Sequence, residues 1–141
     1  MNKFERYEQI DHTADMGIKA FGRSLEALFS NAAYALFDQM VDLSRVKSKT
    51  SVDVEVAAEG LEDLLVRWLS ELLFQFETTL TLFGEFDILN IEEHRLVGRA
   101  FGEQYDPSRH KIYTEVKAVT YHQLEVRRVG DLWQAQVIFD I

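Results

Sequence analysis

Residues 61–76 read LEDLLVRWLSELLFQF, and this stretch decides the fold. Its apolar side chains recur every third or fourth position, the spacing that puts them on one face of an α-helix. Gly60 precedes the stretch, and Glu62 and Asp63 fall in the first turn, where the helix dipole favours negative charge. The apolar face consists of Leu61, Leu64, Leu65, Trp68, Leu69, Leu72, Leu73 and Phe76. The sequence therefore predicts a helix that buries one stripe against a sheet.

A second amphipathic helix is predicted upstream. Ser24 is a favourable N-cap residue, and Glu26 lies in the first turn. The apolar residues repeat with the same period and comprise Leu25, Leu28, Phe29, Ala32, Ala33, Leu36, Phe37 and Met40. Such stripes are far more often packing faces than cofactor-binding elements, so we expect both helices to cover one face of a sheet.

The remaining segments have the pattern of β-strands. Polar and apolar residues alternate from Ser51 to Val56, which is typical of a half-buried strand. Further β-like runs are Met16–Phe21, Phe86–Ile91, Arg95–Phe101, Ile112–Tyr121, Leu124–Val129 and Leu132–Phe139. Residues 102–111 (GEQYDPSRHK) are expected to form a loop. The order β, α, β, α and then strands predicts one α+β domain over residues 1–141, with a largely antiparallel sheet.

The composition excludes several classes of function. The chain has 141 residues, with 24 Asp and Glu against 15 Lys and Arg, which gives a formal charge of −9. We therefore expect no strong direct binding to nucleic acid, because duplex binding would require a local basic patch. The absence of cysteine excludes disulfides, thiolate nucleophiles and Cys-ligated metals. A metal ion would have to be held by oxygen or histidine.

The sequence also predicts a cytoplasmic protein that does not cross a membrane. Met1–Tyr7 is not followed by the apolar run of a signal peptide. Residues 61–76 are interrupted by charged side chains at intervals that a bilayer-spanning helix would not tolerate.

The densest group of polar residues precedes the first predicted strand. Asp11-His12-Thr13-Ala14-Asp15 supplies two carboxylates, an imidazole and a hydroxyl on one short segment. Two carboxylates on one turn can begin a site for a hard cation, although the spacing is not that of an EF-hand. The alternative is that both aspartates bond to nearby backbone amides in turns, and the spacing alone favours this alternative.

The other end of the chain carries a second anionic group. Asp140 lies next to Ile141, so its side chain would neighbour the terminal carboxylate, and a cation or a basic side chain would relieve their repulsion. The alternative is a solvated, frayed end. Lys117, on the predicted strand 112–121, is either a solvated ion-pair partner or a cationic contact in a site.

No other recognised catalytic or nucleotide-binding motif is present. The four histidines, His12, His94, His110 and His122, lack the spacing of a zinc-binding helix, and a lone histidine is more often a hydrogen-bonded structural residue. The sequence has neither a phosphate-binding glycine loop nor a nucleophile elbow.

Four elements together resemble the archease family: HTAD at residues 12–15, the loop at 102–110, KAVTYH at 117–122 and the terminal FDI at 139–141. The resemblance covers nearly the whole chain. It implies an α+β fold related to strand–helix–strand–strand modules. It also implies that Asp15, Asp140 and the carboxylate of Ile141 hold a divalent metal, calcium or magnesium. Lys117 would be a further functional residue, and Asp11, His12 and His122 are additional candidates from the same elements.

The resemblance further implies a protein that is not itself an enzyme. Archeases activate the GTP-dependent RNA-splicing ligase that joins 3′-phosphate and 5′-hydroxyl ends in tRNA splicing and RNA repair. They promote guanylylation of the ligase and its multiple turnover. Two alternatives remain open at this point: a general chaperone or adaptor of nucleic-acid-modifying enzymes, and a stand-alone metal-dependent phosphoesterase.

Overall fold

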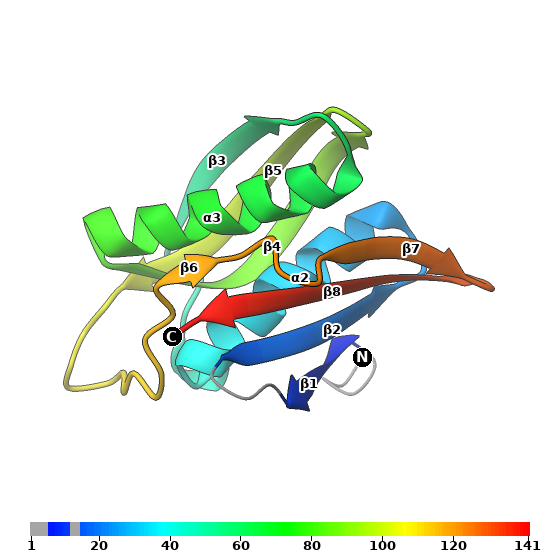
Figure 1. Ribbon diagram of the computed structural model, residues 1–141. Helices are drawn as coiled ribbons and strands as arrows, with labels where there is room; N and C mark the ends of the chain where they lie inside the picture. Colours follow the sequence, from blue (N-terminus) through cyan, green and yellow to red (C-terminus); the bar gives the residue numbers. More distant parts are fainter. Residues whose placement is uncertain (1–5, 12–14) are drawn as a thin grey trace.

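The strands form two antiparallel sheets. The computed structural model describes residues 6–11 and 15–141. The larger sheet has the order β1-β2-β8-β6, and β7 also pairs with β8 (Figure 1). Its strands are β1 (Tyr7–Asp11), β2 (Met16–Gly22), β6 (Ala118–Val119), β7 (Glu125–Val129) and β8 (Leu132–Asp140). The smaller sheet has the order β3-β5-β4, from β3 (Thr50–Ala57), β4 (Thr81–Glu92) and β5 (Arg95–Gln104).

The first helix, α2 (Leu25–Met40), is tied to both sheets. The side-chain amide of Asn31 donates to the carbonyl of Phe21 in β2, at 2.7 Å. One residue earlier, the Ser30 hydroxyl donates to the carbonyl of Phe86 in β4, at 2.9 Å. Ser24 caps the helix as predicted, because its hydroxyl accepts from the amide of Ala27.

The second helix, α3 (Leu61–Thr79), crosses over the smaller sheet (Figure 1). It ends at Leu80, which adopts the left-handed conformation with φ of 56°. Between the two helices, a short 3₁₀ turn, η1 (Leu43–Arg45), leads into β3.

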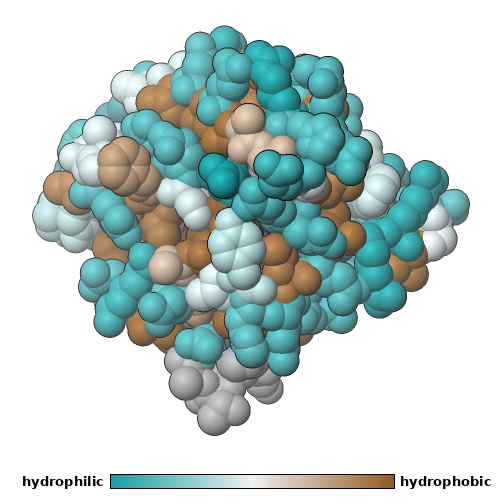
Figure 2. Space-filling model, turned by 45° about the horizontal axis from the view of Figure 1, so that its top comes forward, coloured by the Kyte–Doolittle hydropathy of each residue, from teal (hydrophilic) through white to brown (hydrophobic). Residues whose placement is uncertain are grey.

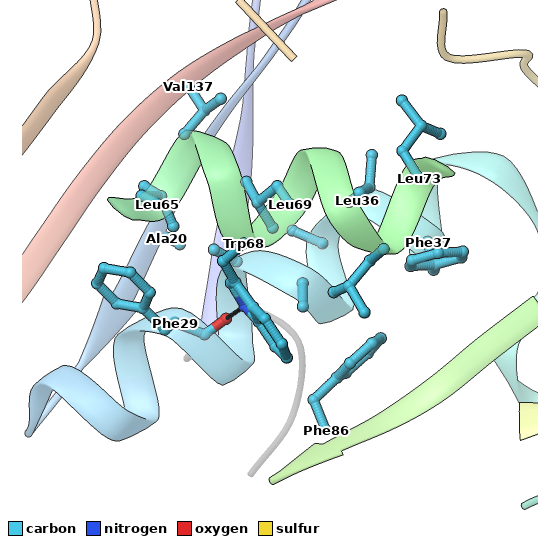
Figure 3. Close-up of a cluster of buried hydrophobic side chains, with 14 of the residues drawn as sticks. Ala20, Phe29, Leu36, Phe37, Leu65, Trp68, Leu69, Leu73, Phe86 and Val137 are labelled. Carbon is cyan, nitrogen blue, oxygen red and sulfur yellow. Dashed lines mark hydrogen bonds between the residues drawn. The ribbon is translucent and has the colours of Figure 1, made fainter. Parts of the chain in front are cut away.

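Trp68 is the centre of the core where the helices meet. Its side chain is fully buried, and the indole N–H donates to the carbonyl of Phe29 in α2, at 3.0 Å (Figure 3). The ring lies over Gly98 of β5 so closely that a Cβ there would stand 2.9 Å from it. The stripe in residues 61–76 therefore has the packing role that its spacing predicts.

The predicted class, α+β with two helices and largely antiparallel strands, is confirmed, and four details differ. The strands divide between two sheets. The sequence did not predict β1, a mostly polar strand that pairs along β2. The loop begins later than predicted, because β5 continues to Gln104.

The fourth difference is that the predicted strand Ile112–Tyr121 is wrong except at Ala118–Val119. This segment is mostly irregular because only its end pairs with β8, apart from an isolated bridge between Ile112 and Val41. Its β-like composition reflects burial: Val116, for example, reaches the core with 2% of its surface exposed.

No helix in the described part of the chain is both long and apolar enough to cross a membrane. On the face in Figure 2, apolar side chains appear in separate groups between hydrophilic ones.

Candidate functional site

Asp15 and Asp140, which lie near the two ends of the sequence, meet at the ends of two neighbouring strands in the larger sheet. β2 and β8 are antiparallel neighbours, with Met16 opposite Phe139. Asp15 directly precedes β2, so the same register extended by one position brings it opposite Asp140. The sheet therefore joins two acidic residues that lie almost a full chain length apart in sequence.

Lys117 reaches the same point from the other side of β8. β6 pairs with β8 so that Ala118 faces Asp140, and the Lys117 amide donates to the Asp140 carbonyl at 2.7 Å. The side chains of Lys117 and Asp140 are exposed, Ile141 is 41% exposed and Asp15 is partly buried. We refer to Asp15, Lys117, Asp140 and Ile141 as the strand-end site.

The donors at the strand-end site are oxygens. In residues 6–11 and 15–141, no group of three or more His, Cys, Asp or Glu side chains is arranged to hold a metal ion. The two aspartate side chains are nevertheless hard oxygen donors, as calcium and magnesium prefer, and Ile141 would add an oxygen of its main chain. The donor chemistry fits such a cation, with the remaining ligands left to water or to a partner.

The remaining candidates are Asp11, His12 and His122, and the structure describes two of them. The backbone of Asp11 lies opposite Met16 at the end of β1. His12 lies outside the described residues. His122 lies in the turn after β6, where its amide donates to the Thr120 hydroxyl at 3.2 Å, and its side chain is exposed.

Sequence reasoning missed a second polar cluster, centred on Glu103 near the end of β5. The carboxylate is 3% exposed and receives two parallel bonds from the Arg109 guanidinium, of 2.9 and 2.7 Å. The backbone amide of Lys47 donates to the same carboxylate at 2.8 Å. Arg109 and these further donors hold the pKa of Glu103 far below its ordinary value. We refer to Glu103, Arg109 and His110 as the loop anchor.

His110 completes the loop anchor as a neutral imidazole. Its Nδ1 accepts from the backbone amide of Asp106 at 3.0 Å, so the ring proton is on Nε2. Nε2 then donates toward the Arg45 carbonyl at 3.0 Å and Glu103 at 3.1 Å. The interpretation of a lone histidine as structural is confirmed here. The available signal for Glu103 was Arg109 in the same loop, because a guanidinium can pair with a carboxylate through two parallel hydrogen bonds.

A hydrogen bond attaches the chain after β6 to α3. The Tyr121 hydroxyl donates to Asp63 at 2.5 Å, and Asp63 also accepts from Arg67 at 3.0 Å. These two donors lower the pKa of Asp63, and the bond to Asp63 raises the pKa of Tyr121. The segment that carries Lys117 is thereby held at both the sheet and the helix.

Comparison with known proteins gives a consistent result. The family model described as "Archease protein family (MTH1598/TM1083)" matches residues 7–141. The protein archease of Methanosarcina barkeri is 42% identical, over 97% of both chains. That of Pyrococcus furiosus is 41% identical over the full length of both.

Solved structures agree with this assignment. Protein 1598 of Methanobacterium thermoautotrophicum, determined in solution, superposes with a TM-score of 0.86 at 38% identity, over 97% of this chain and 99% of that one. A crystal structure from Thermotoga maritima, described as an archease and possible chaperone, shares the fold, with a TM-score of 0.58 at 23% identity over 95% and 96% of the two chains. The chain belongs to the archease family.

Proposed function

We propose that this protein activates the GTP-dependent RNA-splicing ligase that joins 3′-phosphate to 5′-hydroxyl ends, in tRNA splicing and RNA repair in the cytoplasm. It promotes guanylylation and repeated turnover of the ligase and catalyses no reaction itself. The observation that carries the proposal is the convergence of Asp15, Lys117 and Asp140 on neighbouring strand ends. These are the residues that the archease motifs in this sequence contribute.

The charge of the protein supports docking to a basic partner. A formal charge of −9 on 141 residues gives a field that speeds encounter with a positively charged surface. An RNA-binding enzyme carries such a surface, because it must neutralise phosphates. The carboxylate of Asp140, which is exposed at the end of β8, would be one contact with such a surface.

The strand-end site would hold calcium or magnesium through Asp15, Asp140 and the main-chain carboxyl group of Ile141. When bound, the cation supplies positive charge that can orient phosphate oxygens at the ligase. Lys117 would supply a second cation from the neighbouring strand end, where its backbone amide is bonded to the Asp140 carbonyl. The antiparallel pairing of β2, β8 and β6 holds these groups in place, so little ordering is needed on docking.

The test is multiple-turnover joining of 3′-phosphate RNA to 5′-hydroxyl RNA by a limiting amount of cognate ligase, with GTP and metal. Adding this protein should raise the number of turnovers, and Asp15→Ala or Asp140→Ala should abolish the gain. Asp131→Ala is the matched control, since Asp131 is an exposed aspartate in the turn at the opposite end of β8. It removes the same charge and should leave the gain intact.

Two results would contradict the proposal. If the cognate ligase gains nothing from the wild-type protein, a chaperone or adaptor role becomes the better interpretation. If the protein alone turns over phosphoesters and Asp140→Ala stops this, it is a metal-dependent hydrolase.

A further inference from the structure

A basic surface lies around the loop after β5, in a chain that is acidic overall. It comprises Arg45 and Lys47 near η1, Lys49 before β3, and Arg109 and Lys111 in the loop. These are five of the fifteen Lys and Arg side chains in the chain. Their concentration on two adjoining segments is the local basic patch that the overall composition does not provide.

The loop anchor brings these two segments together. Arg109 Nη2 donates to the Arg45 carbonyl at 3.1 Å, and His110 bonds the same carbonyl. The Lys47 amide bonds Glu103 from the other side. The basic surface is therefore built on a support whose backbone is fixed by several hydrogen bonds, two of them partly buried.

The nearby acidic groups are engaged within the protein. Glu103 is buried and paired with Arg109, while Asp106 accepts from the amide and hydroxyl of Ser108. Asp42, beside Arg45, accepts in the same way from the amide and hydroxyl of Ser44. Among the described residues, no carboxylate lies within ion-pair distance of the side chains of Arg45, Lys47 or Lys111. Their charges therefore face solvent without a counter-ion from this part of the chain.

Two hollows flank the loop and give the surface its shape. One, of about 320 Å³, is lined by Arg45, Arg109, Lys111 and Tyr113, together with Asp42. The other, of about 470 Å³, is lined by Lys49, Arg109 and Tyr105, together with the engaged carboxylates of Glu103 and Asp106. Tyr113 is 58% exposed, although its backbone amide is fixed by a bond to the Met40 carbonyl. An exposed aromatic residue that lines the same hollow as cationic side chains is suited to stack a base while its phosphates are neutralised.

We infer that this basic surface binds single-stranded nucleic acid, with phosphates on Arg45 and Lys111 and a base on Tyr113. An acidic protein would satisfy the cations but would make no use of the exposed ring. The contact is local and weak, since the rest of the molecule repels a polyanion. It does not depend on the proposed ligase partner.

The test uses the full chain and a short fluorescein-labelled oligouridine, with fluorescence anisotropy at low ionic strength. The double variant Arg45→Glu/Lys111→Glu should weaken binding by roughly tenfold or more, and added salt should weaken wild-type binding steeply. Arg127→Glu/Arg128→Glu, in the β7 hairpin, makes the same charge change elsewhere and should weaken binding by no more than about twofold.

Tyr113→Leu separates stacking from charge. The ring is exposed, so the fold should persist, and binding should weaken by about fivefold or more. Absence of wild-type binding at low ionic strength would overturn the inference, as would equal losses in the two double variants. No loss in Tyr113→Leu, or equal displacement of the RNA by polyglutamate, would show a general anion surface instead. Because the assay contains no ligase, none of these results bears on the activator proposal.

Discussion

The loop anchor and the strand-end site are both concentrations of charge, but the fold treats them in opposite ways. Glu103 is 3% exposed, and Arg109, His110 and the Lys47 amide meet its oxygens from within the chain. At the strand ends, Lys117 and Asp140 are exposed and joined through backbone atoms. A buried cluster whose polar groups bond one another stabilises the fold. Exposed charges on rigid strand ends are instead available to bind a ligand or a partner.

The largest effect on stability should come from removing the centre of the loop anchor. Glu103→Ala leaves the Arg109 guanidinium and the Lys47 amide without their acceptor, at a cost of roughly 3 kcal/mol in the free energy of unfolding. The melting temperature should fall by about 6–12 °C. Glu103→Gln should cost less, because the amide oxygen can still accept one bond. Thermal melts that match the wild type would show that the cluster is not structural.

A smaller effect should appear at low pH. The pKa of Glu103 is lowered in the folded protein, so its stabilisation is complete above its ordinary value of 4.5. It should be lost progressively as the pH falls below that value toward the folded pKa. Urea titrations should show a shallower acid-side loss in Glu103→Gln than in the wild type. Parallel curves for the two proteins would mean that other carboxylates dominate.

Tyr121→Phe tests a contact whose expected effect on stability lies between those of the loop anchor and the strand-end site. It removes the hydroxyl that bonds Asp63 while keeping the ring, and both groups are near the surface. The melting temperature should fall by about 2 °C or less, because exposed polar pairs contribute little. The same variant should lower ligase activation if the contact fixes the segment that carries Lys117. Full activation would limit the role of the contact to local order.

The smallest effect on stability should be at the strand-end site itself. Asp140→Ala removes an exposed side chain whose backbone bonds remain, so the melting temperature should change by no more than about 2 °C. The same substitution should abolish ligase activation. Circular dichroism distinguishes this loss of activation from unfolding. A large drop in melting temperature would show that the strand-end site stabilises the fold, as the loop anchor does.

The sequence predicted the helices closely because their signals are local. The predicted stripe that starts at Leu25 ends at Met40, as α2 does. The predicted stripe in residues 61–76 begins at Leu61, as α3 does. The strand prediction at 112–121 failed because strand formation depends on a partner, and only Ala118–Val119 has one in β8. The division into two sheets is equally non-local.

The candidate site was predictable in its residues but not in its geometry. Spacing alone favoured turn-forming roles for Asp11 and Asp15, and only the family motifs singled out Asp15 and Asp140 together. That Lys117 adjoins them follows from the pairing of β6 with β8. Glu103 was missed because a buried glutamate breaks the alternation on which strand prediction depends.

The position of β8 has a consequence for how the protein is made. This strand joins β2, β6 and β7 in one sheet, yet it follows all the other described strands in the sequence. The hairpin of β1 and β2 leaves the ribosome before β8 and cannot complete its sheet until β8 has been synthesised. Such non-local pairing slows folding and leaves a waiting edge open to the wrong neighbour. A nascent chain arrested before β8 would therefore be a client for chaperones. Its strand-end site would not be assembled, because β8 is the strand that joins Asp15 to Lys117.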